Sequence, residues 1–174
     1  MDSIIDKCKI IYKGDVIAGL IYFLIGILFI VFGLTSRYLN LSPGFTYLSI
    51  GFLLFSAYCI GKGIMIMLYS YRRMKIFDNT NHISAQLLDE EIAYTSYRIQ
   101  KKHINRRVYT YMLVFFSVLS FVGLFTAHKA VFTGTSIPIA LISGIEFSIG
   151  ILTEFRLKEF NRILNKFKNN RNVG

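Results

Sequence analysis

Long apolar runs alternate with charged segments along this chain. Uncharged runs extend from Val16 to Ser36, from Tyr38 to Gly61 and from Val108 to Ala127. A fourth run, from Ala130 to Leu152, contains a single charged residue, Glu146. The apolar core of a bilayer is roughly 30 Å thick, and about 20 helical residues cross it. The pattern therefore predicts an all-α membrane protein with four transmembrane helices in two hairpins and with helical cytoplasmic extensions.

The charged segments divide the chain into five predicted parts. These are an interfacial amphipathic helix (1–14), a first transmembrane hairpin (15–71), a cytoplasmic charged helix (72–107), a second transmembrane hairpin (108–156) and a cytoplasmic helical tail (157–174). We expect Gly14 to end the first helix and Asp15 to cap the next. Pro43 and Pro138 are each expected in the first turn of a span. No cleavage site typical of a signal peptide follows the first span, which is expected to remain as an anchor.

Basic residues are concentrated on one side of the predicted membrane. The chain has 20 Lys and Arg against 10 Asp and Glu. The Lys and Arg residues precede the first span, fill the central segment and follow the last span. The loops between hairpin arms hold only Arg37 and Lys129. Cytoplasmic loops carry this excess of positive charge. We therefore expect a multi-pass protein of the bacterial inner membrane with both termini in the cytoplasm, contact with anionic lipids of the inner leaflet, and no binding of nucleic acid.

Apolar residues recur at helical spacing in the two polar segments that flank the second hairpin. Ser84 is expected to cap a helix that runs directly into the third span. We expect the apolar stripes to pack on each other or on a cytoplasmic protein partner. This packing seam consists of Leu88, Ile92, Thr95, Ile99, Leu157, Phe160, Leu164 and Phe167. A basic face on the same central helix consists of Arg98, Lys101, Lys102, Arg106 and Arg107.

Small residues mark the faces on which membrane helices approach closely. Gly19, Gly26 and Gly33 are spaced by seven residues in the first span, so they form one stripe along a helix. The other small residues expected at helix contacts are Gly51, Ser143, Gly144 and Gly150. Two interpretations are open: the stripe packs on another helix of the same chain, or it packs on a neighbouring copy in a homo-oligomer.

Two charged residues lie inside predicted spans. Lys62 is ten residues ahead of Arg72, and Glu146 is ten residues ahead of Arg156, where each helix leaves the membrane on the cytoplasmic side. Both charges therefore lie roughly 15 Å from that exit and can meet. They form a buried ion pair in one interpretation, within a chain or between chains. In a second, Glu146 lines a pathway for an ion or proton, and in a third Lys62 reaches the headgroups while Glu146 stays protonated.

No pattern predicts a cofactor, a metal site or a reaction. Cys8 and Cys59 are expected in different environments, so no disulfide is predicted. Arg98 and His103 form an R-x4-H arrangement that resembles the short signature of HEPN-type ribonucleases. The resemblance implies RNA cleavage by paired motifs in a helical dimer, but a solvated face of a basic helix explains the same residues. We therefore expect that this protein is not an enzyme.

The function predicted from these features is non-enzymatic. We expect an integral membrane protein that self-associates and offers a charged helical surface to a partner, as a pore-type effector or as a sensor or scaffold subunit. Its size, hairpins and charged helical part resemble, in outline, the membrane components of bacterial anti-phage systems. One alternative is a small ion-coupled or proton-coupled transporter or channel that uses Glu146. Another is a colicin-type membrane immunity protein.

Overall fold

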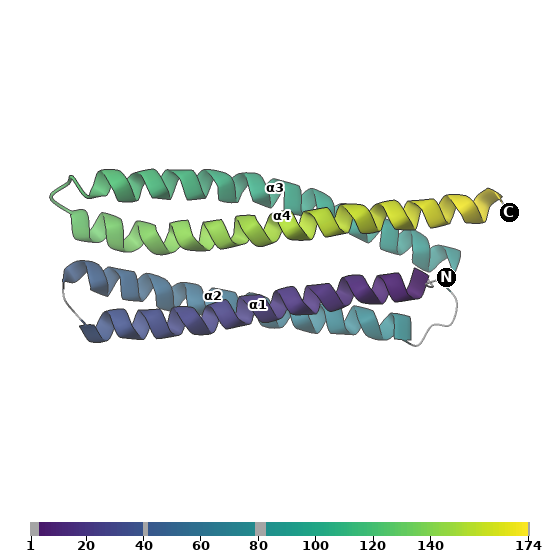
Figure 1. The fold of residues 1–174 in the computed structure, drawn as a ribbon, viewed down its shortest axis with the longest axis horizontal. Helices are drawn as coiled ribbons and strands as arrows, with labels where there is room; N and C mark the ends of the chain where they lie inside the picture. Colours follow the sequence, from purple (N-terminus) through teal and green to yellow (C-terminus); the bar gives the residue numbers. More distant parts are fainter. Residues whose placement is uncertain (1–3, 40–41, 79–82, 174) are drawn as a thin grey trace.

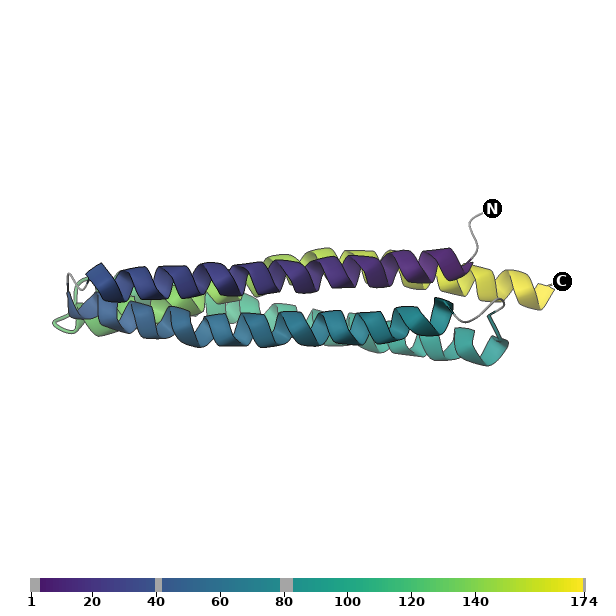
Figure 2. The ribbon, with the colours of Figure 1, turned by 90° about the horizontal axis from the view of Figure 1, so that it is seen from below.

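Four long helices lie side by side in a bundle (Figure 1). The structure is a computed structural model and describes residues 4–39, 42–78 and 83–173. The helices are α1 (Ile4–Leu39), α2 (Pro43–Asp78), α3 (Ala85–Gly123) and α4 (Lys129–Val173). The start of α1, the end of α2, the start of α3 and the end of α4 lie together at one end (Figures 1 and 2). We call this end, formed by residues 4–15, 72–78, 83–107 and 153–173, the polar end, and the remainder the apolar half.

Three of the helices, α1, α2 and α4, are long and apolar enough to cross a membrane. The third span expected from the sequence falls on α3, which is not one of them. The uncharged run begins at Val108, but α3 ends at Gly123 and turns follow it. The helical part of the run is therefore shorter than the about 20 residues that a bilayer core requires. The all-helical class is confirmed, and three helices have the length and hydropathy of membrane spans.

The helices form two antiparallel pairs. α1 packs along α2, and α3 packs along α4, while α4 also contacts α2 and, less extensively, α1. Within the described residues, no Cα atom of α3 lies within 8 Å of α1 or α2. Only side chains can therefore join α3 to the first helix pair.

α1 is one continuous helix, and the predicted break at Gly14 is wrong. Asp15 does not cap a helix; its carboxylate is buried and accepts a hydrogen bond from Arg98 of α3 at 2.6 Å. The first residues of α1 do not form a separate interfacial helix either. Cys8 and Tyr12 lie in an apolar cluster of the polar end. Tertiary packing thus keeps the helix intact through a glycine, whose local preference costs only about 1 kcal/mol.

The two prolines have different positions. Pro43 is the first residue of α2, as expected for a residue without a backbone N–H. The prediction for Pro138 is wrong, because α4 begins at Lys129 and the proline lies inside the helix. Its ring packs on Gly51 of α2, where an added Cβ would lie 2.7 Å from Pro138 Cγ. The glycine makes room for the ring at this contact.

Ser84 caps α3 as predicted. Its side chain accepts a hydrogen bond from the backbone N–H of Leu87 at 3.1 Å. From this cap, α3 continues without interruption from the polar end into the apolar half, and α4 continues in the opposite direction to Val173. The predicted helical continuity between the apolar and polar segments is therefore confirmed for α3 and α4.

Glycines bring the backbones of α1 and α2 together. An added Cβ at Gly63 would lie 2.6 Å from the carbonyl oxygen of Gly19 and 2.9 Å from the backbone nitrogen of Phe23. An added Cβ at Gly26 would lie 3.1 Å from the carbonyl oxygen of Ser56. The glycine stripe of α1 therefore packs on α2 within the same chain. Backbone atoms cannot rotate away as a side chain can, so a larger residue would push the helices apart.

Gly63→Ala is expected to lower the free energy of unfolding by about 1–3 kcal/mol, because the new methyl group meets backbone atoms. Gly61→Ala is the matched control two residues away, since an added Cβ at Gly61 meets nothing within 4 Å. Thermal unfolding of both variants in detergent measures the difference. Equal melting temperatures would contradict the close α1–α2 contact.

Candidate functional site

The two charges predicted inside the spans meet in the interior of the bundle. Glu146 of α4 is 4% exposed. The ammonium of Lys62 on α2 donates to Glu146 Oε1 and forms an ion pair with it. Tyr22 of α1 donates to Oε2 at 2.9 Å, and Tyr58 of α2 donates to Oε1 at 3.1 Å. Donors from two helices thus occupy both oxygens of a carboxylate carried by a third.

Aromatic rings enclose the Lys62 ammonium. Its Nζ donates to the Tyr58 hydroxyl at 3.1 Å and lies 4.6 Å from the ring centroid of Tyr22. A cation above an aromatic face gains electrostatic stabilisation there. The Tyr58 hydroxyl also lies 3.5 Å from that of Tyr109, which links α3 to the cluster. The interpretation in which Lys62 extends to the headgroups apart from Glu146 is wrong, because the two form a pair within one chain.

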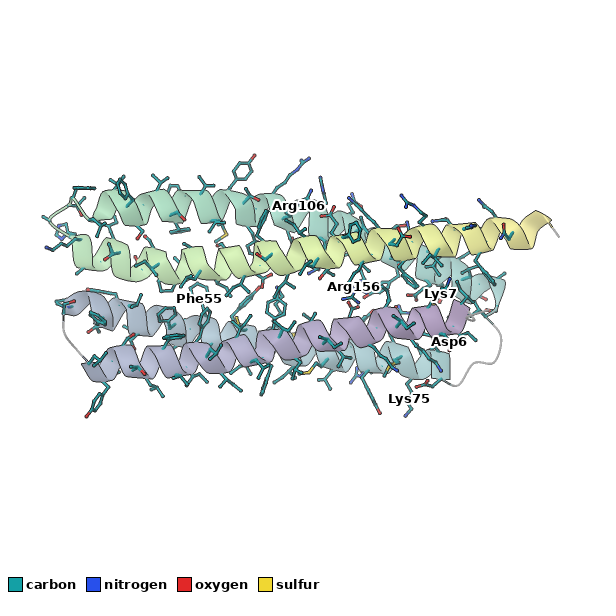
Figure 3. All side chains as sticks on the ribbon, viewed as in Figure 1. Asp6, Lys7, Phe55, Lys75, Arg106 and Arg156 are labelled. Atoms are coloured by element: carbon teal, nitrogen blue, oxygen red, sulfur yellow. The ribbon has the colours of Figure 1, made fainter. Side chains whose placement is uncertain are left out.

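A second buried carboxylate, Asp15 of α1, lies nearer the polar end. Arg98 of α3 donates to Asp15 Oδ2 at 2.6 Å, and Arg156 of α4 approaches Oδ1 at 4.0 Å. Arg156 also donates to the carbonyl oxygen of Ile11 at 2.9 Å and lies between α4 and α1 (Figure 3). Asp15 therefore joins three helices.

Glu91 of α3 is the third buried carboxylate. It accepts a hydrogen bond from the Tyr12 hydroxyl of α1, and Arg73 of α2 lies 3.9 Å from its other oxygen. Burial raises the pKa of the Glu91 carboxyl, against the opposing effects of Tyr12, Arg73 and Arg98. Its position in the core therefore makes Glu91 bind a proton at a higher pH than an exposed glutamate does.

Glu154 of α4 is the fourth buried carboxylate and is bound mostly from α3. Arg106 lies 3.0 Å from Oε2, and His103 Nδ1 lies 3.6 Å from Oε1. Lys158, one turn further along α4, lies 2.7 Å from Oε1. We call the four clusters around Glu146, Asp15, Glu154 and Glu91 the charge ladder. The clusters around Glu146, Asp15 and Glu91 connect the two helix pairs, and the Glu154 cluster joins α3 to α4 within the second pair.

Of the four buried carboxylates in the charge ladder, the sequence patterns predicted only Glu146 as a site residue. Asp15, Glu91 and Glu154 were not predicted as site residues, although a sequence signal exists for Glu91. Glu91 follows Leu88 by three residues and precedes Thr95 by four, so it lies on the same helix face as the packing seam. An acidic residue on an apolar face of a basic segment is the pattern that identifies such a position.

The packing seam lies inside the protein's own polar end. Leu88, Phe160 and Leu164 form one apolar cluster with Cys8 and Tyr12 of α1 and with Phe77 of α2. Thr95 and Leu157 are also buried, Ile92 and Ile99 are partly buried, and Phe167 is exposed. The seam is therefore a shared core and not a free surface, which corrects its assignment to an external partner.

The small residues divide into covered and open positions. The glycine stripe of α1 and Gly51 are covered within the chain, and Ser143 is buried and donates to the Ile139 carbonyl oxygen at 2.7 Å. An added Cβ at Gly144 would meet only Leu113 at 3.7 Å, and one at Gly150 would meet nothing within 4 Å. The stripe of α1 is thus unavailable to a neighbouring copy in this arrangement.

The basic face is not uniformly solvated. Arg98 and Arg106 bind the buried carboxylates of Asp15 and Glu154, whereas Arg107 is exposed. Lys101 and Lys102 have no acidic partner among the described residues; Lys101 lies 5.9 Å from the ring centroid of Tyr97. The structure also separates the two residues of the R-x4-H arrangement, because Arg98 and His103 approach different carboxylates.

Cys8 and Cys59 are buried as free thiols. Among the described residues, no group of three His, Cys, Asp or Glu side chains could hold a metal ion. Comparisons of the chain with protein-family models, with curated proteins and with solved structures find no match.

Lys62→Met is expected to lower the free energy of unfolding by about 3–5 kcal/mol, because it leaves the buried Glu146 without its cation. Glu146→Gln should cost less, since Lys62 is 23% exposed and can reach more polar surroundings. The double variant should recover part of the loss caused by Lys62→Met. Unfolding of the four proteins in detergent measures this coupling. Strictly additive losses would show that the two side chains do not depend on each other.

Proposed function

We propose that this chain is a non-enzymatic integral membrane protein with four transmembrane helices, which binds a cytoplasmic protein partner at its polar end as a sensor or scaffold subunit. One observation carries the proposal. α1, α2, α3 and α4 each run unbroken between the apolar half and the polar end, and buried ion pairs join them. A rigid helix transmits a displacement along its length, and buried charge pairs favour discrete arrangements over gradual ones.

The fourth span is supported by the packing of α3. Its apolar part lies along the membrane-spanning part of α4: Gly123 packs on Phe132, and Leu113 lies beside Gly144. A helix packed antiparallel on a spanning helix shares its depth in the bilayer. The exposed apolar side chains of this part of α3 suit contact with lipid: Val114, Phe115, Val118 and Phe121. We therefore place α3 across the membrane in spite of its short apolar helix.

Cysteine labelling of bacterial cells with a membrane-impermeant maleimide tests this topology. Tyr38→Cys and His128→Cys are expected to react in intact cells. Both residues are exposed, and they lie at the far end of the apolar half, opposite the polar end. Gln86→Cys and Lys166→Cys should react only after lysis. If α3 did not cross the membrane, α4 would begin in the cytoplasm and end outside the cell. Lys166→Cys would then react without lysis.

The unmodified chain serves as the background in this experiment. Both native cysteines, Cys8 and Cys59, are buried. They are expected to stay unlabelled in the folded protein, with or without lysis.

Exposed apolar residues of the polar end are the candidates for a partner surface, because the packing seam is already covered. Ile10 of α1 is 63% exposed there, outside the apolar half in which exposed apolar residues suit lipid. Isolated exposed apolar residues are common on protein surfaces, but at this end Ile10 is a well-placed probe.

A photoreactive amino acid at Ile10 is expected to form one discrete adduct with a second protein in native cells. The same probe at Tyr38, which is 90% exposed at the opposite end, is the control and should not form that adduct. Gel mobility and mass spectrometry identify the product. An adduct with a second copy of the chain would show that this surface mediates self-association and does not bind a different protein. The absence of any adduct would contradict a partner at this surface.

A transporter that uses Glu146 is the second candidate, and one feature favours it. A cavity of about 400 Å³ is lined in part by Tyr22 and Lys62. A second cavity of about 350 Å³ is lined in part by Tyr58 and Glu146. Asn105 lines both. Carboxylates inside membrane-spanning segments often mark pathways for ions or protons.

Proton flux into liposomes that contain the purified protein distinguishes the candidates. Because both oxygens of Glu146 are occupied, we expect the wild type to show no flux above that of protein-free liposomes. Glu159→Gln is the matched control, since Glu159 pairs with Arg162 on the surface. Flux in the wild type and in Glu159→Gln that is lost in Glu146→Gln would favour transport over the sensor or scaffold.

A further inference from the structure

A cavity with both apolar and charged lining residues lies between α2 and α3, at the junction of the apolar half and the polar end. Its volume is about 400 Å³, within the range of small-molecule sites. All four helices contribute to its wall. α2 and α3 do not approach each other through their backbones, so the cavity lies between two helices joined by side chains alone. Tyr69 and Tyr94 make one such junction, with ring centroids 5.9 Å apart.

The charge of the cavity wall is unbalanced. Four cations line it, Lys62, Arg98, Lys101 and Lys102, against one carboxylate, Asp15. Lys62 is neutralised by Glu146, and Arg98 by Asp15. The two remaining lysines have no acidic partner among the described residues. The structure therefore leaves an excess of two positive charges at this wall.

Lys102 is the more buried of the two remaining lysines. It is partly buried, and burial together with the nearby Lys62 ammonium lowers the pKa of the Lys102 side chain, against the opposing effects of the Glu146 and Asp15 carboxylates. The same wall offers polar groups that can orient a ligand, Asn105 and the Tyr97 hydroxyl among them. An anion in the cavity would lie near two ammonium groups that lack a counter-charge, and it would favour the charged form of Lys102.

We propose that this cavity binds the phosphate group of an anionic phospholipid, with Lys101 and Lys102 as its principal ligands. The surroundings favour a lipid over a soluble phosphate. Met65 of α2 lines the cavity and is 72% exposed, and the apolar Leu68 is exposed one turn of the helix away. Acyl chains can lie along this surface while the phosphate enters between α2 and α3. Tyrosines at the cavity match the aromatic residues found at the level of lipid headgroups.

The site is independent of the partner proposed above, since it concerns a different ligand and a different level of the bundle. It also assigns the surplus of basic residues a specific use. General attraction of a positive protein to an anionic leaflet would involve all exposed basic residues alike. A built site, by contrast, depends on the residues that line the cavity.

The experiment uses the full chain in detergent, with short-chain phosphatidylglycerol and phosphatidylcholine as probes. Native mass spectrometry and the melting temperature are expected to show one tightly retained phosphatidylglycerol and a stabilisation that phosphatidylcholine does not produce. Lys101→Gln/Lys102→Gln should weaken phosphatidylglycerol binding roughly tenfold or more. Lys102→Arg should retain it, because the positive charge remains.

Arg107→Gln/Lys166→Gln is the matched control. It removes the same charge from exposed positions outside the cavity and should bind phosphatidylglycerol within about twofold of the wild type. The melting temperature of each variant without lipid reports whether it folds. Equal losses in the two double variants would overturn the proposal in favour of diffuse attraction. Equal stabilisation by inorganic phosphate or glycerol phosphate would overturn the choice of a lipid.

Discussion

A buried carboxylate needs a positive charge and hydrogen-bond donors, and this requirement organises the whole bundle. Four acidic side chains lie in the interior, on α1, α3 and α4, and each binds a cation from another helix. Removing ions from water is costly, so each pair stabilises only the arrangement in which its geometry is complete. The charge ladder therefore contributes more to the choice of one helix register than to stability as such.

The two helix contacts along α2 follow opposite physical rules. Glycines let α2 and α1 meet backbone to backbone, where dispersion contacts dominate. α2 and α3, by contrast, remain apart and are joined by aromatic and charged side chains such as Tyr69, Arg73 and Tyr94. A close contact leaves no room for a ligand, whereas a separated one creates the cavity. The proposed phosphate site is thus a consequence of how α3 is held.

The buried Glu146 carboxylate has a structural role in the bundle, because it binds donors from two other helices. The oxygens of Glu146 are bound by Lys62, Tyr22 and Tyr58 and are not free to act on a substrate. At the cavity wall, Lys101 and Lys102 form no ion pair with an acidic side chain among the described residues. These two lysines are the basis of the proposed phosphate site. The distribution of charge also separates the protein into a membrane part, a polar end and a charged junction between them.

The sequence alone determined the helices, the Ser84 cap, the continuity of α3 and α4, and the matching depth of Lys62 and Glu146. These depend on periodicity and on distance along one helix, which the order of residues specifies. Only the tertiary structure decided that Gly14 stays helical, that Asp15 meets Arg98, and that the packing seam is a shared core. The reason is geometric: partners across a bundle depend on how separate helices rotate and approach each other, and local sequence does not encode that rotation.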